Sequence, residues 1–199
     1  MAPRAPRAAA PVTGSPHTVG LVIVHSSMTM KMNHSRLTTC TYASPLGPLT
    51  LIAGKHGLRA VIWPGEPHAR VGLAGVELME KDDPMLAQAS VQLEEYFNGS
   101  RQSFDLPLDL HGTRFQVAAW RALAEIPYGE TRTYAEQAER LGRPRAFRAV
   151  GAANGRNPLS IVLPCHRVVG SNGSLTGFAA GLDVKRALLD HEQVVRARL

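Results

Sequence analysis

Cysteine is scarce in this chain of 199 residues, which contains only Cys40 and Cys165. Two thiols allow neither a disulfide framework nor a zinc site built from four cysteines. The longest apolar run, residues 19–24, is far shorter than the ~20 residues that a helix needs to cross a bilayer. These shortages exclude disulfide-rich scaffolds and membrane-spanning helices. They predict a cytoplasmic protein in which a thiol of functional importance is reactive.

Acidic residues are absent from residues 1–36 and rare in residues 132–167, where seven arginines face only Glu136 and Glu139. Arginine carries a rigid fork of donors that suits phosphate groups. A basic segment within an otherwise balanced chain is typical of a surface that binds polyanions. A solvated arginine-rich surface is the alternative, and charge alone does not decide between the two. The eight histidines are scattered and form no close-spaced ligand pair, so we expect no metal.

Hydrophobic residues make up 44% of the chain, enough for a buried core. Residues 1–36 show no pattern that could bury a face. We expect them to be a flexible tail, or to reflect a start codon placed upstream of the true one, and we leave them out of the fold. The pattern of residues 37–199 predicts an α+β protein. Residues 37–112 are expected to form a small N-terminal α/β domain with a short antiparallel sheet. Residues 113–199 are expected to form a mainly helical, helix-turn-helix (winged-helix-like) C-terminal domain.

Turn residues divide the first half of the chain into short elements. Strands are predicted at residues 38–43, 49–53 and 58–63, followed by a loop at 65–75. Asp83 as N-cap and Pro84 predict the start of a helix that ends at Asn98. Residues 104–110 alternate and predict an edge strand. This half contains no catalytic constellation.

The second half is predicted to be mostly helical. Thr113 caps a helix, Thr133 caps a shorter one to Leu141, and Pro144 starts a third over residues 145–154. The last two have helix-turn-helix proportions. A buried, strand-like run at 159–163 precedes Cys165, and a loop at 170–177 precedes a final helix from Asp183 to about Val194.

Cys165 is followed at once by His166, and this pair is the main candidate for chemistry. A thiolate is the reactive form of cysteine, and a neighbouring histidine can act as its base. Glu192 is a candidate for orienting the imidazole, and Asn157 for bracing the loop through its side chain. The alternative for an isolated cysteine is a small buried hydrophobic residue.

The sequence around this pair resembles the O6-alkylguanine-DNA alkyltransferases, also called methylated-DNA–protein-cysteine methyltransferases. The resemblance rests on RAVG at 148–151, Asn154, NP at 157–158 and IVLPCHRVV at 161–169, together with PYGET at 127–131 and LLDHE at 188–192. It extends from Phe115 to Glu192, is looser from Thr41, and is absent before Leu37.

In this family the Cys165 thiolate would attack the alkyl carbon on guanine O6. His166 would take the thiol proton through a water, Glu192 would hold the imidazole, and Tyr134 would donate a proton toward guanine N3. Asn157 would support the loop. The resulting thioether makes the protein a single-use reagent that needs no cofactor. The substrate would be double-stranded DNA carrying O6-methylguanine, and O4-methylthymine as well, with no obligate protein partner and a monomeric protein.

The resemblance also implies how DNA is handled. The target base must be flipped out of the duplex. The residues implied to bind DNA are Arg145, Arg148, Ala149, Gly151 and Ala152, with Arg148 filling the gap in the stack and the small residues allowing entry into the minor groove. The flipped base would be lined by Tyr134, Val168, Phe178 and Ala179. The loop departs from the family pattern at Phe178, a usual tyrosine, and at Ala180, a usual glycine. Ala180 would cost roughly 1 kcal/mol if the position needs a positive φ.

Four other functions are weaker alternatives. A lesion-binding alkyltransferase-like protein lacks the nucleophile that Cys165 provides here. A regulator with a methylphosphotriester-sensing zinc domain needs four cysteines. A sequence-reading repressor would explain the basic helix pair but would leave the PCHR segment without a purpose. A cysteine hydrolase would need a substrate cleft for which no residues are evident.

Overall fold

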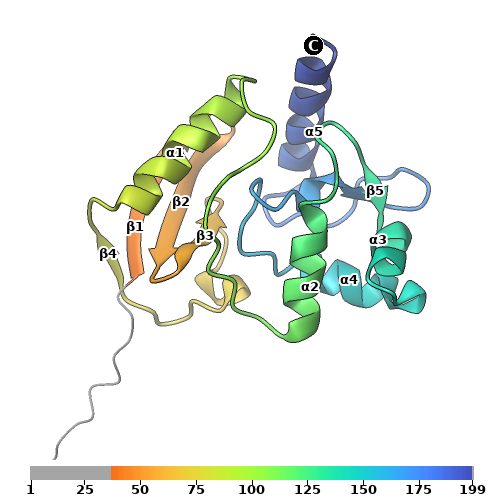
Figure 1. Ribbon diagram of the computed structural model, residues 1–199, viewed down its shortest axis with the longest axis horizontal. Helices are drawn as coiled ribbons and strands as arrows, with labels where there is room; N and C mark the ends of the chain where they lie inside the picture. The colour runs from red at the N-terminus through yellow and green to blue at the C-terminus, as the bar shows by residue number, and fades with distance from the viewer. Residues whose placement is uncertain (1–36, 199) are drawn as a thin grey trace, which may run out of the picture. The chain divides into compact units, whose positions relative to one another are not determined.

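The computed structural model describes residues 37–198. The expectations for residues 1–36 therefore lie outside the described part of the chain. Within it, the observed architecture has the predicted class: a small sheet with one helix, followed by a mainly helical segment with a helix-turn-helix (Figure 1).

The first half forms a four-stranded sheet. β1 (Leu37–Ser44), β2 (Gly47–Gly54) and β3 (Gly57–Ile62) pair antiparallel, while β4 (Leu78–Glu80) pairs parallel to β1, giving the order β3-β2-β1-β4. The three predicted strands are present, but the sheet is mixed. β4 has only three residues, too few to show an alternating pattern in the sequence. The segment expected to be a loop contains a short 3₁₀ helix, η1 (His68–Val71).

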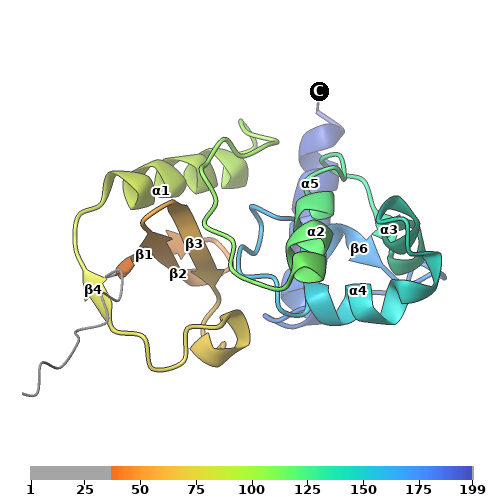
Figure 2. The same ribbon diagram turned by 60° about the horizontal axis from the view of Figure 1, so that its bottom comes forward.

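Alternation along the strands gives the sheet two buried faces. Leu49 and Leu51 pack into the main core, which also contains Leu93 of α1 (Pro84–Phe97), whereas Ile52 and Ile62 pack into a smaller cluster with Val71 of η1. Asp83 caps α1 as predicted, because its side chain accepts the backbone N–H of Met85 at 2.9 Å. α1 thus covers one face of the sheet and η1 the other (Figures 1 and 2).

The edge strand predicted at residues 104–110 is wrong. Only a single bridge forms there, with Leu58 donating to Pro107 O at 2.8 Å and accepting from Asp109 at 2.9 Å. Gly57 makes this approach possible, since a Cβ on it would lie 2.1 Å from the Pro107 oxygen. The same edge of β3 also reaches the second half of the chain, where Val61 donates to Pro158 O at 2.8 Å.

The second half consists of α2 (Arg114–Leu123), β5 (Arg132–Thr133), α3 (Tyr134–Arg140), η2 (Pro144–Ala146), α4 (Phe147–Asn154), η3 (Cys165–Arg167), β6 (Val168–Val169) and α5 (Leu182–Arg196). Thr113 and Thr133 both form capping boxes, as their positions predict. The third helix starts later than expected, because residues 144–146 form a 3₁₀ turn before α4. Figure 2 shows α3 and α4 beyond α2, on the side away from the four-stranded sheet.

One core joins the two halves. Leu93 and Tyr96 from α1 lie in the same cluster as Leu123, Val168 and Leu188 from the second half. The site described next is built across this shared core. No helix within residues 37–198 combines the length and the apolar character that a bilayer span requires.

Candidate active site

The segment that leads to Cys165 is a turn, and the side chain of Asn157 holds it in shape. This side chain donates to Leu163 O at 2.7 Å and accepts from the Leu159 N–H at 3.0 Å. The strand expected at residues 159–163 therefore does not form, because local bonds curl the backbone. Ile161, buried in this turn, has a φ of 71°, a left-handed conformation that is unfavourable for a β-branched residue. Strain of this kind persists only where the surroundings impose it.

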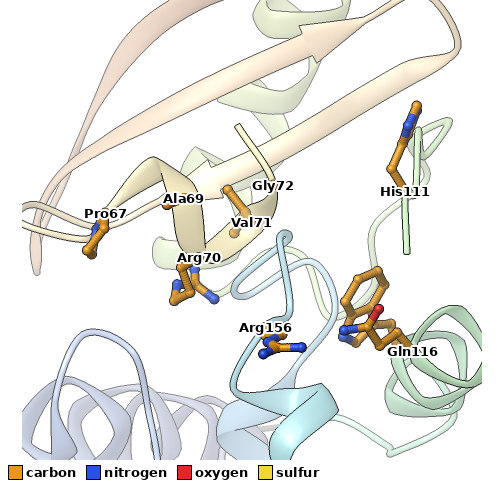
Figure 3. Close-up of a pocket in the computed structure, with 9 residues that line it drawn as sticks. Pro67, Ala69, Arg70, Val71, Gly72, His111, Gln116 and Arg156 are labelled. Atoms are coloured by element: carbon orange, nitrogen blue, oxygen red, sulfur yellow. The ribbon is translucent and has the colours of Figure 1, made fainter. Parts of the chain in front are cut away.

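Arg70 of η1 holds the same turn from the other half of the chain. Its guanidinium donates to the carbonyl oxygens of Asn157 at 2.9 Å and Gly155 at 3.2 Å, and it forms an ion pair with Glu66. Figure 3 shows Arg70 directed toward the segment that bears Arg156. A cavity of about 570 Å³ lies here, lined also by Gln116, Trp120 and His111, and none of the predicted catalytic residues borders it. The first half of the chain thus supports the turn that carries the thiol.

Cys165 starts η3 and is buried, with 8% of its surface exposed. Burial raises the pKa of its thiol, while the nearby Asn157 amide and the charges of Lys185 and Arg70 act in the opposite direction. The thiol is therefore neutral at physiological pH. It needs a base to react, and cations are placed to stabilise the thiolate that forms.

His166 is fully buried and its Nε2 lies 2.7 Å from Oε1 of Glu192. Burial lowers the pKa of the imidazole, so the ring is neutral at physiological pH. Because the carboxylate is an acceptor, Nε2 carries the proton and Nδ1 presents its lone pair. Nδ1 is buried and bonded to no other group among the described residues. It is the atom available to receive a proton.

Glu192 lies at the centre of a buried hydrogen-bond network. Besides His166, Arg167 binds both of its oxygens at 2.8 and 2.9 Å, Tyr96 donates at 2.8 Å and the Gly129 N–H at 3.0 Å. Burial alone would raise the pKa of Glu192, but the bonds from His166 and Arg167 hold it well below the ordinary range. All acceptor positions of the carboxylate are used, which fixes its orientation and that of the imidazole.

Tyr134, the first residue of α3, lies against the loop that follows β6. Its hydroxyl donates to Thr176 O at 3.2 Å. The same oxygen accepts from the ammonium of Lys185 at 2.6 Å, and this ammonium also donates to Val168 O at 2.6 Å. Burial raises the pKa of Tyr134, the bond to Thr176 acts in the opposite direction, and the charge of a Cys165 thiolate raises the pKa again. The phenol therefore keeps its proton at physiological pH and is able to donate it.

The predicted pocket residues lie around this point. Val168 is buried, Phe178 is half-buried with its ring 6.4 Å from that of His166 and 6.3 Å from that of Trp63, and Ala179 is exposed. Ala180 does not adopt a positive φ, whereas Gly177 and Gly181 do, at 51° and 92°. The alanine at 180 therefore imposes no backbone strain on the loop.

The predicted DNA-binding residues lie on η2 and α4. Arg145, Arg148, Ala149 and Ala152 are exposed and Gly151 is half-buried. Gly151 faces the site, because a Cβ on it would lie 3.7 Å from the Tyr134 ring. A buried hydrogen bond joins α4 to α3, because the side-chain amide of Asn154 donates to that of Gln137 at 2.8 Å. This bond holds α4 in place beside Tyr134.

Five contributors to the site were not recognised in the sequence: Arg70, Tyr96, Gly129, Arg167 and Lys185. Tyr96 comes from the half that seemed to contain no catalytic constellation, and only the fold brings it to Glu192. Lys185 gave no signal beyond its place on a helix. Arg167 is part of the IVLPCHRVV string, but only the tertiary structure shows that it donates to Glu192.

Comparison with known families identifies both halves. Residues 38–110 match the model for the ribonuclease-like domain of 6-O-methylguanine DNA methyltransferase, and residues 114–194 match the model for its DNA-binding domain. The chain belongs to the 6-O-methylguanine DNA methyltransferase family. The resemblance seen in the sequence is thereby confirmed.

Relatives in this methyltransferase family align along most of their length. The methylated-DNA–protein-cysteine methyltransferase of Methanosarcina barkeri is 48% identical over 151 residues, which is 75% of this chain and 93% of that protein. The Mycobacterium tuberculosis protein of the same name is 46% identical over 161 residues, with 77% and 90% coverage. A crystal structure of Mycobacterium tuberculosis OGT in complex with DNA superposes with a TM-score of 0.69 at 44% identity, covering 80% of this chain and 94% of that one.

Proposed function

We propose that this protein repairs O6-methylguanine in duplex DNA by transferring the methyl group irreversibly to Cys165. The observation that carries the proposal is the buried bond between His166 and Glu192 beside the buried Cys165, in a chain whose relatives are named methylated-DNA–protein-cysteine methyltransferases. DNA is the partner, as in the complex of the Mycobacterium tuberculosis relative. The pocket serves O4-methylthymine by the same chemistry.

The reaction is a single displacement. Sγ of Cys165 forms a bond to the methyl carbon while the bond from that carbon to guanine O6 breaks, and the electron pair stays on the purine. The thiol proton passes through a water to Nδ1 of His166, whose Nε2–H is held by Glu192 at 2.7 Å. Tyr134 gives its proton toward guanine N3, which neutralises the leaving purine. The thioether does not turn over.

The duplex has to present its lesion outside the stack, at a cost of a few kcal/mol. We assign Arg148 to the gap that the base leaves, with Ala149, Gly151 and Ala152 allowing α4 to approach the minor groove closely. Arg145 contacts phosphate. The base enters between Tyr134, Val168 and Phe178, and the Ala179 backbone faces O6. Contacts of this kind are led by phosphate charge, so binding weakens as salt rises.

The experiment that tests the function is intact-protein mass spectrometry after mixing with a duplex that carries one O6-methylguanine. We expect a stoichiometric gain of one CH₂, mapped to Cys165 and absent in Cys165→Ala. An unchanged mass with the duplex still bound would overturn the proposal and favour a lesion-binding protein without transfer.

The pH dependence of transfer follows from the protonation states. His166 must be neutral, and burial lowers its pKa below 6.5; Tyr134 must be protonated, and burial raises its pKa above 10.0. We therefore expect the second-order rate constant to be flat from pH 6.5 to about pH 9, measured by rapid quench. A rate that rises tenfold per pH unit across this range would show that free thiolate, without help from His166, is the reactant.

A further inference from the structure

Phe147, the first residue of α4, is a large apolar side chain on a strongly basic surface. It is 44% exposed, and its ring lies 5.6 Å from the guanidinium carbon of Arg148. Arg143 and Arg145 precede it and are also exposed. None of the three arginines 143, 145 and 148 forms an ion pair within residues 37–198. An aromatic ring among unpaired cations fits a partner that is both anionic and rich in flat apolar faces.

The helical repeat places Phe147 on the face of α4 that leads to the site. Residues four apart lie above one another on a helix, so Phe147 shares its face with Gly151. Gly151 in turn lies against Tyr134, with 3.7 Å between its hypothetical Cβ and the ring. Beyond Phe147 and Arg148, the exposed positions of α4 up to Ala152 carry no side chain larger than a methyl group. These two residues are therefore the only bulky groups projecting from this part of the helix.

We propose that Phe147 enters the minor groove together with Arg148 and stacks on the base step next to the extruded nucleotide. The wedge then consists of two side chains: Arg148 fills the vacated position, and Phe147 covers the exposed face of the neighbouring base. This assignment rests on the proposed function, since it requires that the lesion be flipped out of a duplex. Proteins that bend DNA from the minor groove insert apolar side chains such as phenylalanine in this way.

The expected effect is confined to reactions that involve duplex DNA. Loss of one base–aromatic stacking contact corresponds to a drop of roughly fivefold to 150-fold in the rate constant for transfer from a duplex. Methyl transfer from the free base O6-methylguanine needs no extrusion, so its rate constant remains unchanged. A ring that merely packed against α4 would have a different signature, because its loss would loosen the site and slow both reactions equally.

The test compares wild type, Phe147→Ala and Phe147→Trp, with Val91→Ala as a matched control because Val91 is an apolar residue of α1 that is 57% exposed. Each protein is assayed for transfer from a duplex and from the free base, and for the fluorescence of 2-aminopurine placed beside the lesion. We expect Phe147→Ala to show the lowered rate constant for duplex transfer and to lose the fluorescence change. Phe147→Trp should keep the wild-type rate and fluorescence change, and Val91→Ala should match wild type.

An unchanged duplex rate in Phe147→Ala, or an equal loss in both reactions, overturns the wedge. A wild type that transfers no methyl group from either source contradicts the proposed function itself. The two failures are thus distinguishable in one set of measurements.

Discussion

Replacing Glu192 by glutamine is expected to lower both the stability of the protein and its rate of methyl transfer. Arg167 is 5% exposed and donates two of its bonds to Glu192. The neutral amide leaves that buried guanidinium without its counter-charge, and breaking a buried ion pair costs about 3–5 kcal/mol. The amide NH₂ also competes to donate to Nε2 of His166, which favours the tautomer whose Nδ1 is already protonated. In a comparable triad the wrong tautomer costs about 10⁴-fold, so we expect transfer to fall about 10²- to 10⁴-fold.

The matched control is Glu130→Gln. Glu130 forms an ion pair with Arg196 at 3.0 Å, but both side chains are about half exposed, and such surface pairs contribute about 0–1 kcal/mol. Urea denaturation and rapid-quench transfer on both variants separate the roles. Equal behaviour of the two variants would show that the network around Glu192 neither stabilises the fold nor orients the imidazole.

Acid is expected to reduce the difference in the free energy of unfolding between the wild type and Glu192→Gln. The bonds from His166 and Arg167 hold the folded-state pKa of Glu192 well below its ordinary value of 4.5. A carboxylate with a depressed pKa contributes its full stabilisation above the unfolded-state value and loses it as pH falls toward the folded-state value. The difference in unfolding free energy between the two proteins is therefore expected to be constant near neutrality and to shrink below about pH 4.5. A difference that persists undiminished at lower pH would contradict the charged network.

Local signals in the sequence predicted most of the elements because the physics there is local. Asp83, Thr113 and Thr133 cap the helices that follow them, since each side chain accepts a backbone N–H two or three residues on. Failures occurred where a distant partner decides the structure. Residues 104–110 alternate as a strand would, yet their backbone pairs with β3 only at Leu58. The run at 159–163 is apolar enough for a strand, but the side chain of Asn157 takes its hydrogen bonds.

The residues of the site fall into the same two groups: those that the local sequence marks and those that a distant partner places. Cys165 and His166 are neighbours in the chain, and the PCHR string marks them without knowledge of the fold. Tyr134 was implied by the resemblance alone, whereas Glu192 was first a candidate for orienting His166 and was then implied by the resemblance as well. Tyr96 and Arg70 had no such marker. Tyr96 lies 96 positions before Glu192, and Arg70 lies 87 positions before Asn157, whose carbonyl oxygen it binds. Only the packing of the two halves against one core brings such distant residues together.

Replacing Lys185 by methionine is expected to impair chemistry much more than folding. The ammonium is fully buried, and burial lowers its pKa while the Cys165 thiolate raises it. Methionine has a similar volume, and removal of a buried charge offsets the loss of its bonds to Val168 O and Thr176 O, so the cost in stability is small. The thiolate, however, loses a nearby cation, and Tyr134 loses the anchor of its partner Thr176. Loss of a hydrogen-bonded charge costs about 1.5–3 kcal/mol, which corresponds to a transfer rate about 10- to 150-fold lower.

Two readouts separate this role from a purely structural one. In a Cys40→Ser background, so that Cys165 is the only thiol, the ultraviolet absorbance of the thiolate should titrate at higher pH in Lys185→Met than in the parent protein. Arg186→Met is the matched control, because Arg186 is the next residue on α5 but is exposed; its titration and its transfer rate should be those of the parent. A Lys185→Met protein with a slower transfer rate but an unshifted thiol titration would show that the lysine acts only by holding the loop at Thr176, because a cation that stabilises the thiolate must lower the pKa of the thiol.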